Sequence, residues 1–149
     1  MIEIESRELA DIPVLHAYPV GQKDTPLPCV IFYHGFTSSS LVYSYFAVAL
    51  AQAGLRVIMP DAPDHGSRFS SDEARRLNQF WQILLQSMQE FTTLRAAIAE
   101  ENWLLDDRLA VGGASMGAMT ALGITARHPT VKCTASMMGS GYFTSLARS

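Results

Sequence analysis

The sequence predicts an α/β fold, with a mostly parallel sheet and helices on both of its faces. Short β-rich runs alternate with longer helical segments along the 149 residues, a pattern typical of strand–helix–strand units. Several runs are almost continuously apolar, as expected for strands buried on both faces of a parallel sheet. No repeat, low-complexity tract or linker-like change of composition divides the chain, so we expect one structural unit over residues 1–149.

The first part of the chain is predicted to form a β-hairpin and then a buried strand. Ile2–Glu8 and Val14–Tyr18 are expected to pair antiparallel, and a loop containing Gly and Pro follows over Pro19–Pro28. Cys29–His34 is an almost continuous apolar run, which predicts a central strand. It ends at the turn His34-Gly35-Phe36-Thr37.

A helix is predicted after this turn, because apolar residues recur at helical spacing as far as Gly54. These residues are Val42, Phe46, Ala49, Leu50 and Ala53. Ser39 or Ser40 is the expected N-cap, since a hydroxyl can accept a hydrogen bond from a free first-turn amide. Leu55–Pro60 is the next predicted strand.

The remaining elements follow a loop rich in Gly, Pro and Asp over Asp61–Ser67. A helical stretch from about Asp72 to Asn102 is expected to form one long helix or two. A strand over Arg108–Gly112, a helix over Met116–Arg127 and a last strand over Val131–Met138 complete the predicted alternation.

One motif carries chemistry. Gly113-Ala114-Ser115-Met116-Gly117 matches Gly-x-Ser-x-Gly and lies between a predicted strand and a predicted helix, which is the context of a nucleophile elbow. The two flanking glycines suit a strained turn whose backbone passes close to neighbouring elements. Ser115 is therefore the predicted nucleophile, exposed above the carboxyl edge of the sheet and supported by Gly113 and Gly117.

Two backbone amides are predicted to serve as an oxyanion hole. The N–H of Met116 lies at the start of a helix, where the helix dipole favours negative charge. The loop after the central strand is expected to bring the N–H of Phe36 close to Ser115. Gly35 would permit the turn of this loop, and the imidazole of His34 is expected to brace it.

The order of these segments resembles the dienelactone-hydrolase and prolyl-oligopeptidase-like branch of the α/β-hydrolase superfamily, over the whole chain. The resemblance rests on His34-Gly35-Phe36, Pro60–Arg68 and Gly113–Gly117, each placed after a strand. It implies hydrolysis of a small, short-chain carboxylic ester through an acyl-enzyme on Ser115. It implies no cofactor, because side chains, backbone amides and water suffice for this mechanism.

The superfamily's catalytic triad runs in the order Ser, acid, His. After Ser115 the only histidine is His128, and no Asp or Glu occurs between Ser115 and Ser149. We therefore expect the N-terminal part of one α/β-hydrolase domain, truncated after the strand that follows the nucleophile helix and inactive without the missing acid and His. That last strand would form an apolar sheet edge, through which copies of the chain could self-associate.

The other histidines are interpreted as scaffold. Asp64 and His65 are adjacent on one loop, a placement that rarely allows an acid–His contact, so His65 is expected to be structural. The resemblance implies that this turn shapes the rim of the site. His16 lies in the predicted hairpin, and His128 lies at a helix end, where it can cap carbonyl groups. Cys29 and Cys133 are expected to be buried free thiols, and neither has the close ligand pair that a metal site needs.

Composition excludes several classes of partner. The net charge is −3 with no run of Lys or Arg, which gives no reason to expect a nucleic acid or an anionic membrane. The acidic N-terminus does not resemble a secretory signal, and no apolar run is long enough to span a bilayer, so a cytoplasmic location is expected.

The sequence leaves alternative functions open. A trypsin-like protease using His34, Asp61 and Ser115 is excluded by the helices that separate the strands, but a non-catalytic interaction module or a gene-decay fragment stays open. Thioester hydrolysis, acyl transfer and peptide cleavage use the same elbow, and acyl and alcohol preferences are undetermined. Apolar side chains that could line the pocket or belong to the core are Met116, Phe36, Tyr142 and Phe143.

Overall fold

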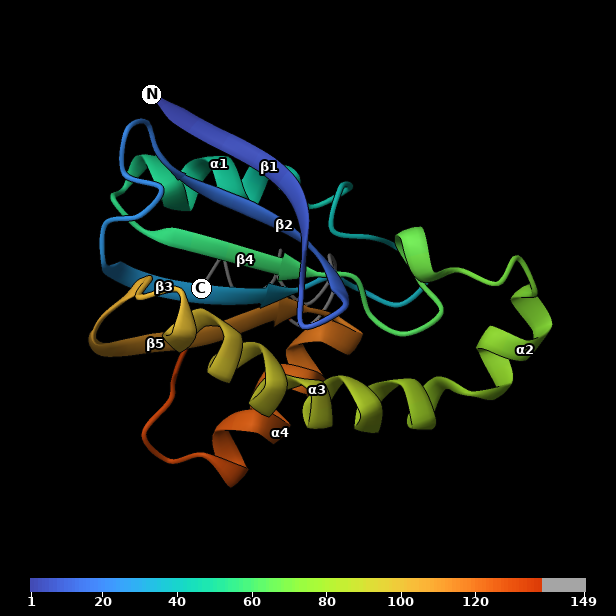
Figure 1. The fold of residues 1–149 in the computed structure, drawn as a ribbon. Coiled ribbons are helices and arrows are strands. Elements are labelled where there is room, and N and C mark those ends of the chain that lie inside the picture. The colour runs from blue at the N-terminus through green and yellow to red at the C-terminus, as the bar shows by residue number, and fades with distance from the viewer. Residues whose placement is uncertain (138–149) are drawn as a thin grey trace, which may run out of the picture.

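A six-stranded mixed sheet, in the order β1-β2-β4-β3-β5-β6, forms the centre of the computed structural model, which describes residues 1–137 (Figure 1). The strands are β1 (Ile2–Leu9), β2 (Ile12–Pro19), β3 (Leu27–Tyr33), β4 (Arg56–Pro60), β5 (Leu104–Ala114) and β6 (Lys132–Met137). The predicted hairpin is confirmed, because β1 and β2 pair antiparallel, and β2 also pairs antiparallel with β4. Strands β3 to β6 are mutually parallel, as predicted.

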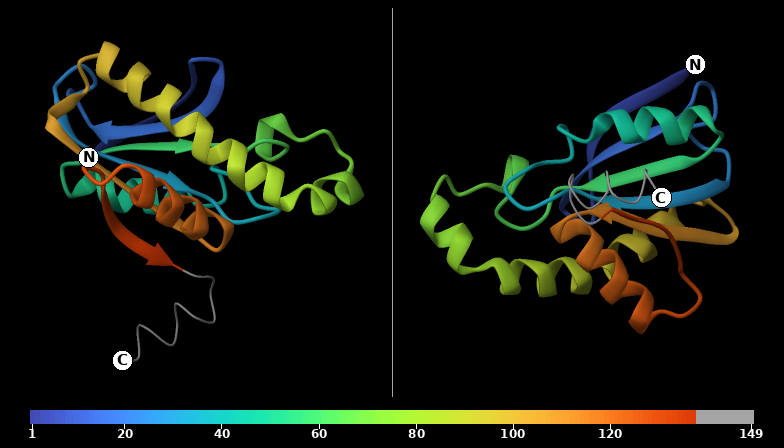
Figure 2. Two further views of the ribbon diagram at one scale, coloured as in Figure 1. Left: turned by 90° about the horizontal axis from the view of Figure 1, so that it is seen from below. Right: turned by 180° about the vertical axis from the view of Figure 1, so that it is seen from behind.

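Helices cover both faces of the sheet (Figure 2, right). They are α1 (Ser44–Gln52), α2 (Glu73–Asn78), α3 (Phe80–Glu100) and α4 (Met116–Arg127), with a 3-10 turn η1 (Gly66–Arg68). On one face, Ala47 and Ala51 of α1 pack against Phe32. On the other face, Phe91 of α3 packs in a cluster with Ile31. Adjacent residues of β3 thus serve opposite cores, as the two-residue period of a strand requires.

The helices α2 and α3 lie after β4, and α2 projects beyond the carboxyl ends of the parallel strands (Figure 1). The long helical stretch is therefore two helices, broken at Gln79. Asp72 caps α2 by accepting a hydrogen bond from the Arg75 N–H at 3.0 Å. Within residues 1–137, none of the helices combines the length and the apolar character needed to cross a bilayer.

Two predicted boundaries differ most from the structure. Helix α1 has Tyr43 at its N-cap position with no side-chain cap, in place of Ser39 or Ser40. The reason is a tertiary contact: the Ser40 N–H donates to Asp61 Oδ1 at 2.9 Å, and this holds residues 40–43 in turns before the helix begins. Strand β5 begins at Leu104 and not at Arg108, with its pairing to β3 shifted between Leu27 and Cys29.

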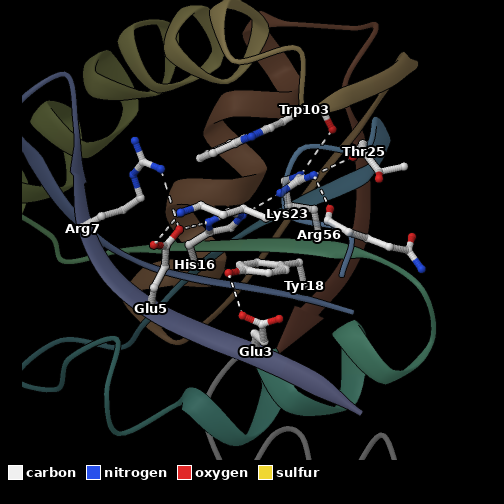
Figure 3. A network of polar contacts seen from close by, with 10 residues as sticks. Glu3, Glu5, Arg7, His16, Tyr18, Lys23, Thr25, Arg56 and Trp103 are labelled. Carbon is white, nitrogen blue, oxygen red and sulfur yellow. Dashed lines mark hydrogen bonds and ion pairs between the residues drawn. The ribbon is translucent and has the colours of Figure 1, made fainter. Parts of the chain in front are cut away.

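A buried polar network joins the amino end of β4 to the hairpin (Figure 3). His16 and Arg56 are both fully buried. His16 Nδ1–H donates to Glu5 at 2.7 Å, and its Nε2 accepts from Arg56 Nη1 at 2.7 Å. Arg56 also donates to the carbonyl groups of Thr25 and Trp103. This arrangement agrees with the scaffold role expected for His16.

Candidate active site

Ser115 occupies a sharp turn between β5 and α4. Its backbone has φ 57° and ψ −118°, a conformation that non-glycine residues adopt at a cost of about 1–3 kcal/mol. The residue is exposed, whereas Ala114 and Met116 on either side are buried. The turn thus projects the hydroxyl beyond the carboxyl end of β5, as expected for a nucleophile elbow.

The two glycines of the motif permit this turn. A Cβ atom on Gly113 would collide with the backbone of Gly117, and one on Gly117 would collide with the carbonyl oxygen of Tyr33 on β3. Both collisions involve backbone atoms, which cannot rotate away. The packing therefore accounts for glycine at both positions and brings the start of α4 directly onto the end of β3.

The loop after β3 lies beside Ser115. A Cβ on Gly35 would be 3.5 Å from the Ser115 Cβ and 3.4 Å from the Ala114 carbonyl oxygen. Within residues 1–137, neither the Phe36 N–H nor the Met116 N–H is paired with a backbone carbonyl. The structure therefore brings together Ser115, the Phe36 loop and the first turn of α4, the three parts that the sequence singled out.

His34 lies beneath this loop and is 2% exposed. Its Nε2 accepts a hydrogen bond from the Ala62 N–H at 3.0 Å, so the proton lies on Nδ1, which donates to the Gly35 carbonyl at 2.8 Å. Burial lowers the pKa of His34 to about 4, so the ring is neutral at pH 7. Both ring nitrogens hold the loop in place.

His65, on the loop after β4, makes the same kind of hydrogen-bond pair as His34. It is fully buried, its Nε2 accepts from the Thr37 N–H at 2.9 Å, and its Nδ1–H donates to the Pro63 carbonyl at 2.9 Å. Burial lowers the pKa of His65 as well. The neighbouring Asp64 instead accepts from the Ser70 N–H at 2.7 Å, so Asp64 and His65 form no acid–His pair with each other.

Asp61 and Arg68 organise the loop after β4, a role that the sequence analysis missed. Asp61 accepts hydrogen bonds from the Ser40 N–H at 2.9 Å and from the Ser67 hydroxyl at 3.1 Å. Arg68 donates to the Asp61 carbonyl at 3.1 Å and makes a bidentate pair with Glu90 on α3 at 2.8 and 2.9 Å. The glycine at position 66 is the one indication of this role in the sequence, because a Cβ there would lie 2.5 Å from the Asp61 carboxylate.

An apolar cluster backs the site. Ala62, Ile83, Leu84 and Met116 are buried there, with Phe36, Phe80 and Met119 packed against them. The rings of Phe36 and Phe80 pack edge to face, with their centroids 4.9 Å apart. The side chain of Met116 therefore belongs to the core, whereas Phe36 is partly exposed. Tyr142 and Phe143, the other candidate wall residues, lie outside the described residues.

No proton acceptor reaches Ser115 within residues 1–137, since no histidine or carboxylate there is hydrogen-bonded to its hydroxyl. His128 follows the far end of α4, which has 12 residues and is therefore about 18 Å long. Its ring packs on Phe91 at 5.0 Å. The Cys29 thiol is buried and its pKa is raised to about 12 by that burial, so it is not a competing nucleophile.

The chain is similar in sequence to known proteins. The family described as serine aminopeptidase, S33, matches residues 24–145. The chain is 98% identical over 149 residues to Esterase YjfP of Escherichia coli (strain K12), covering all of this chain and 60% of that protein. It is 33% identical over 147 residues to YitV of Bacillus subtilis (strain 168), covering 98% of this chain and 58% of that protein.

Solved structures show the same fold. A cold-adapted esterase from an Arctic intertidal metagenomic library superposes with a TM-score of 0.68 at 22% identity, over 99% of this chain and 65% of that chain. The chain spans about 60% of the length of each of the two curated relatives named above. The match over residues 24–145, the elbow at Ser115 and the strand order together show that the chain belongs to the serine aminopeptidase S33 family of α/β-hydrolases.

Proposed function

We propose that this chain supplies the nucleophile and the oxyanion hole of a serine carboxylesterase that hydrolyses short-chain esters. The observation that carries the proposal is the strained backbone of Ser115, at φ 57°, beside the N–H groups of Phe36 and Met116, which have no backbone partner among residues 1–137. An exposed serine held in a costly conformation is typical of a functional site. It also argues against a non-catalytic module, in which nothing would offset that cost.

The mechanism follows from these positions. The Ser115 hydroxyl oxygen attacks the ester carbonyl carbon, and the carbonyl oxygen becomes an oxyanion that accepts hydrogen bonds from the Phe36 and Met116 amides. The tetrahedral intermediate collapses as the C–O bond to the alcohol breaks, leaving an acyl-enzyme that water hydrolyses. A base must take the serine proton and return it to the leaving alcohol.

We propose that the base and its acid partner are supplied by the part of the relatives that this chain does not span. Without a base within hydrogen-bond reach, the Ser115 hydroxyl is a weak nucleophile at neutral pH. The oxyanion hole and binding alone would leave a residual rate enhancement of about 10³–10⁴-fold over water. Most of the activity would therefore belong to a longer protein.

Ester hydrolysis is favoured by the similarity to Esterase YjfP of E. coli, which is 98% identical to this chain over 149 residues. The family description names an aminopeptidase, and the same elbow also serves amide cleavage. A direct comparison of ester and amide substrates therefore has to decide the substrate class.

The experiment measures hydrolysis of p-nitrophenyl acetate, p-nitrophenyl butyrate and an alanine p-nitroanilide. It compares this chain with the longer E. coli relative, each with and without Ser115→Ala or the matching substitution. We expect the relative to cleave the esters only when the serine is present, and this chain to show the same background rate with either residue. Serine-dependent cleavage of the anilide alone would replace the esterase proposal with a peptidase. Serine-dependent activity of this chain would show that its base lies within it.

A further inference from the structure

We propose that His65 is a positioning residue for the oxyanion hole, holding the loop that presents the Phe36 amide. The proposal rests on the function proposed above and assigns a role to a side chain that does not touch the substrate. It is argued from hydrogen bonds that connect the loop after β3 with the loop after β4.

The two loops are joined reciprocally by two imidazoles. His34, on the first loop, accepts the Ala62 N–H of the second loop at 3.0 Å. His65, on the second loop, accepts the Thr37 N–H of the first loop at 2.9 Å. The two rings lie 5.2 Å apart, and neither is exposed by more than 2%. Each loop thus provides a buried acceptor for the backbone of the other.

These contacts fix the peptide planes on both sides of Phe36. The peptide that carries the Phe36 N–H also carries the Gly35 carbonyl, which accepts from His34 Nδ1–H at 2.8 Å. The next peptide carries the Thr37 N–H, which is held by His65. Because a peptide unit is planar and rigid, holding one of its polar atoms fixes the direction of the other. Phe36 is therefore held between two oriented peptides, one by each histidine.

Thr37 also needs this support. Its φ is 65°, a conformation that is uncommon for a non-glycine residue. The aromatic ring of Phe36 contacts the His65 ring edge-on at 5.3 Å, which supports the same segment through its side chain. Loss of the His65 acceptor would leave the Thr37 N–H unpaired and allow the Phe36–Thr37 peptide to rotate.

Such a rotation is expected to affect the transition state more than substrate binding. An oxyanion-hole donor acts on charge that develops only during reaction, and removing one donor typically lowers kcat by about 10²–10³-fold. A misdirected donor should lower kcat less than a missing donor does. We expect a decrease in kcat on the order of 10–100-fold, with KM little changed.

The test compares two polar substitutions at the matching position of the longer E. coli relative. In His65→Gln, the side-chain oxygen can reach the place of Nε2 and accept from the Thr37 amide. In His65→Asn, the shorter amide can replace only Nδ1 and its bond to the Pro63 carbonyl. His128→Gln is the matched control, because His128 packs on Phe91 at the far end of α4. Circular dichroism and thermal unfolding establish that each variant is folded.

We expect His65→Asn to lower kcat for p-nitrophenyl butyrate on the order of 10–100-fold, with KM changed less than about threefold. His65→Gln should retain most of the kcat, and the His128→Gln control should match the parent. Equal kcat losses in the Gln and Asn variants, an effect on KM alone, or failure of both variants to fold would overturn the positioning role. Full activity after substitution of Ser115 would instead overturn the proposed function, whatever the His65 variants show.

Discussion

His16 and Arg56 form a hydrogen bond of 2.7 Å between two fully buried side chains (Figure 3). Arg56 donates, so His16 has to be neutral at Nε2 and to carry its proton on Nδ1, toward Glu5. Burial lowers the pKa of His16 to about 4, and it outweighs the bond to Glu5, which raises the pKa; the positive charge of Arg56 lowers the pKa further. A protonated His16 would place two N–H groups and two positive charges face to face.

This pair predicts acid sensitivity of the fold. A histidine with a lowered pKa in the folded state binds its proton more readily in the unfolded state, so its contribution to stability is complete above about pH 6.5 and is lost as the pH falls toward 4. The loss amounts to about 3 kcal/mol over that window. Urea unfolding of the chain between pH 7.5 and 4.5 measures it.

His16→Gln is the control for this measurement, since it cannot titrate. Its unfolding free energy should fall less steeply with decreasing pH, although His34 and His65 contribute in the same direction because their pKa values are also lowered. Identical slopes in the parent and His16→Gln would contradict a neutral His16 in this network.

Gly117→Ala should destabilise the chain by more than about 3 kcal/mol, because its Cβ would collide with the backbone carbonyl of Tyr33. Gly123→Ala, on the same helix, is the matched control. There the new Cβ would meet only the terminal atoms of Met88, a flexible side chain that can move. Its unfolding free energy should change by no more than about 1 kcal/mol. Denaturant unfolding of both variants checks the difference, and similar values would be inconsistent with the packing at Gly117.

Replacing Ser115 should separate backbone strain from chemistry. Ser115→Gly can adopt φ 57° without a steric penalty, whereas Ser115→Ala keeps the strain of a Cβ. We expect the glycine variant to be more stable than the alanine variant by about 1 kcal/mol, even though glycine loses more entropy on folding. Thermal unfolding of the two variants measures this difference. A less stable glycine variant would mean that the turn stores no strain at this residue.

Glu90→Gln should loosen the loop after β4. The Arg68–Glu90 pair is bidentate and only about a fifth exposed, with side-chain exposures of 21% and 20%. Its loss should cost about 1–2 kcal/mol and speed hydrogen exchange at the Ser67 and Arg68 amides. Glu100→Gln, at the exposed end of α3, is the control and should leave these amides unchanged. Unaltered exchange in Glu90→Gln would show that Asp61 alone holds the loop.

The sequence determined the parts of this protein that depend on local pattern. Continuous apolar runs predicted the central strands β3 and β4, and Gly113 and Gly117 around Ser115 predicted a turn between a strand and a helix. These features are local, because a strand's burial and a tight turn's steric needs are expressed by residues only a few positions apart. The side-by-side placement of Ser115 and the Phe36 loop was predicted from the position of the second oxyanion amide in α/β-hydrolases, and it is consistent with parallel strands that end at one edge of the sheet.

The tertiary structure alone decided which side chains hold that edge together. Thr37 and His65 are 28 residues apart, Ser40 and Asp61 are 21 apart, and His16 and Arg56 are 40 apart. No periodicity links such partners, so Ser40 was expected to cap a helix when its amide is in fact bound by Asp61. Buried polar groups must find a hydrogen-bond partner wherever the fold brings one within reach, and the chain's path through space decides which partner that is.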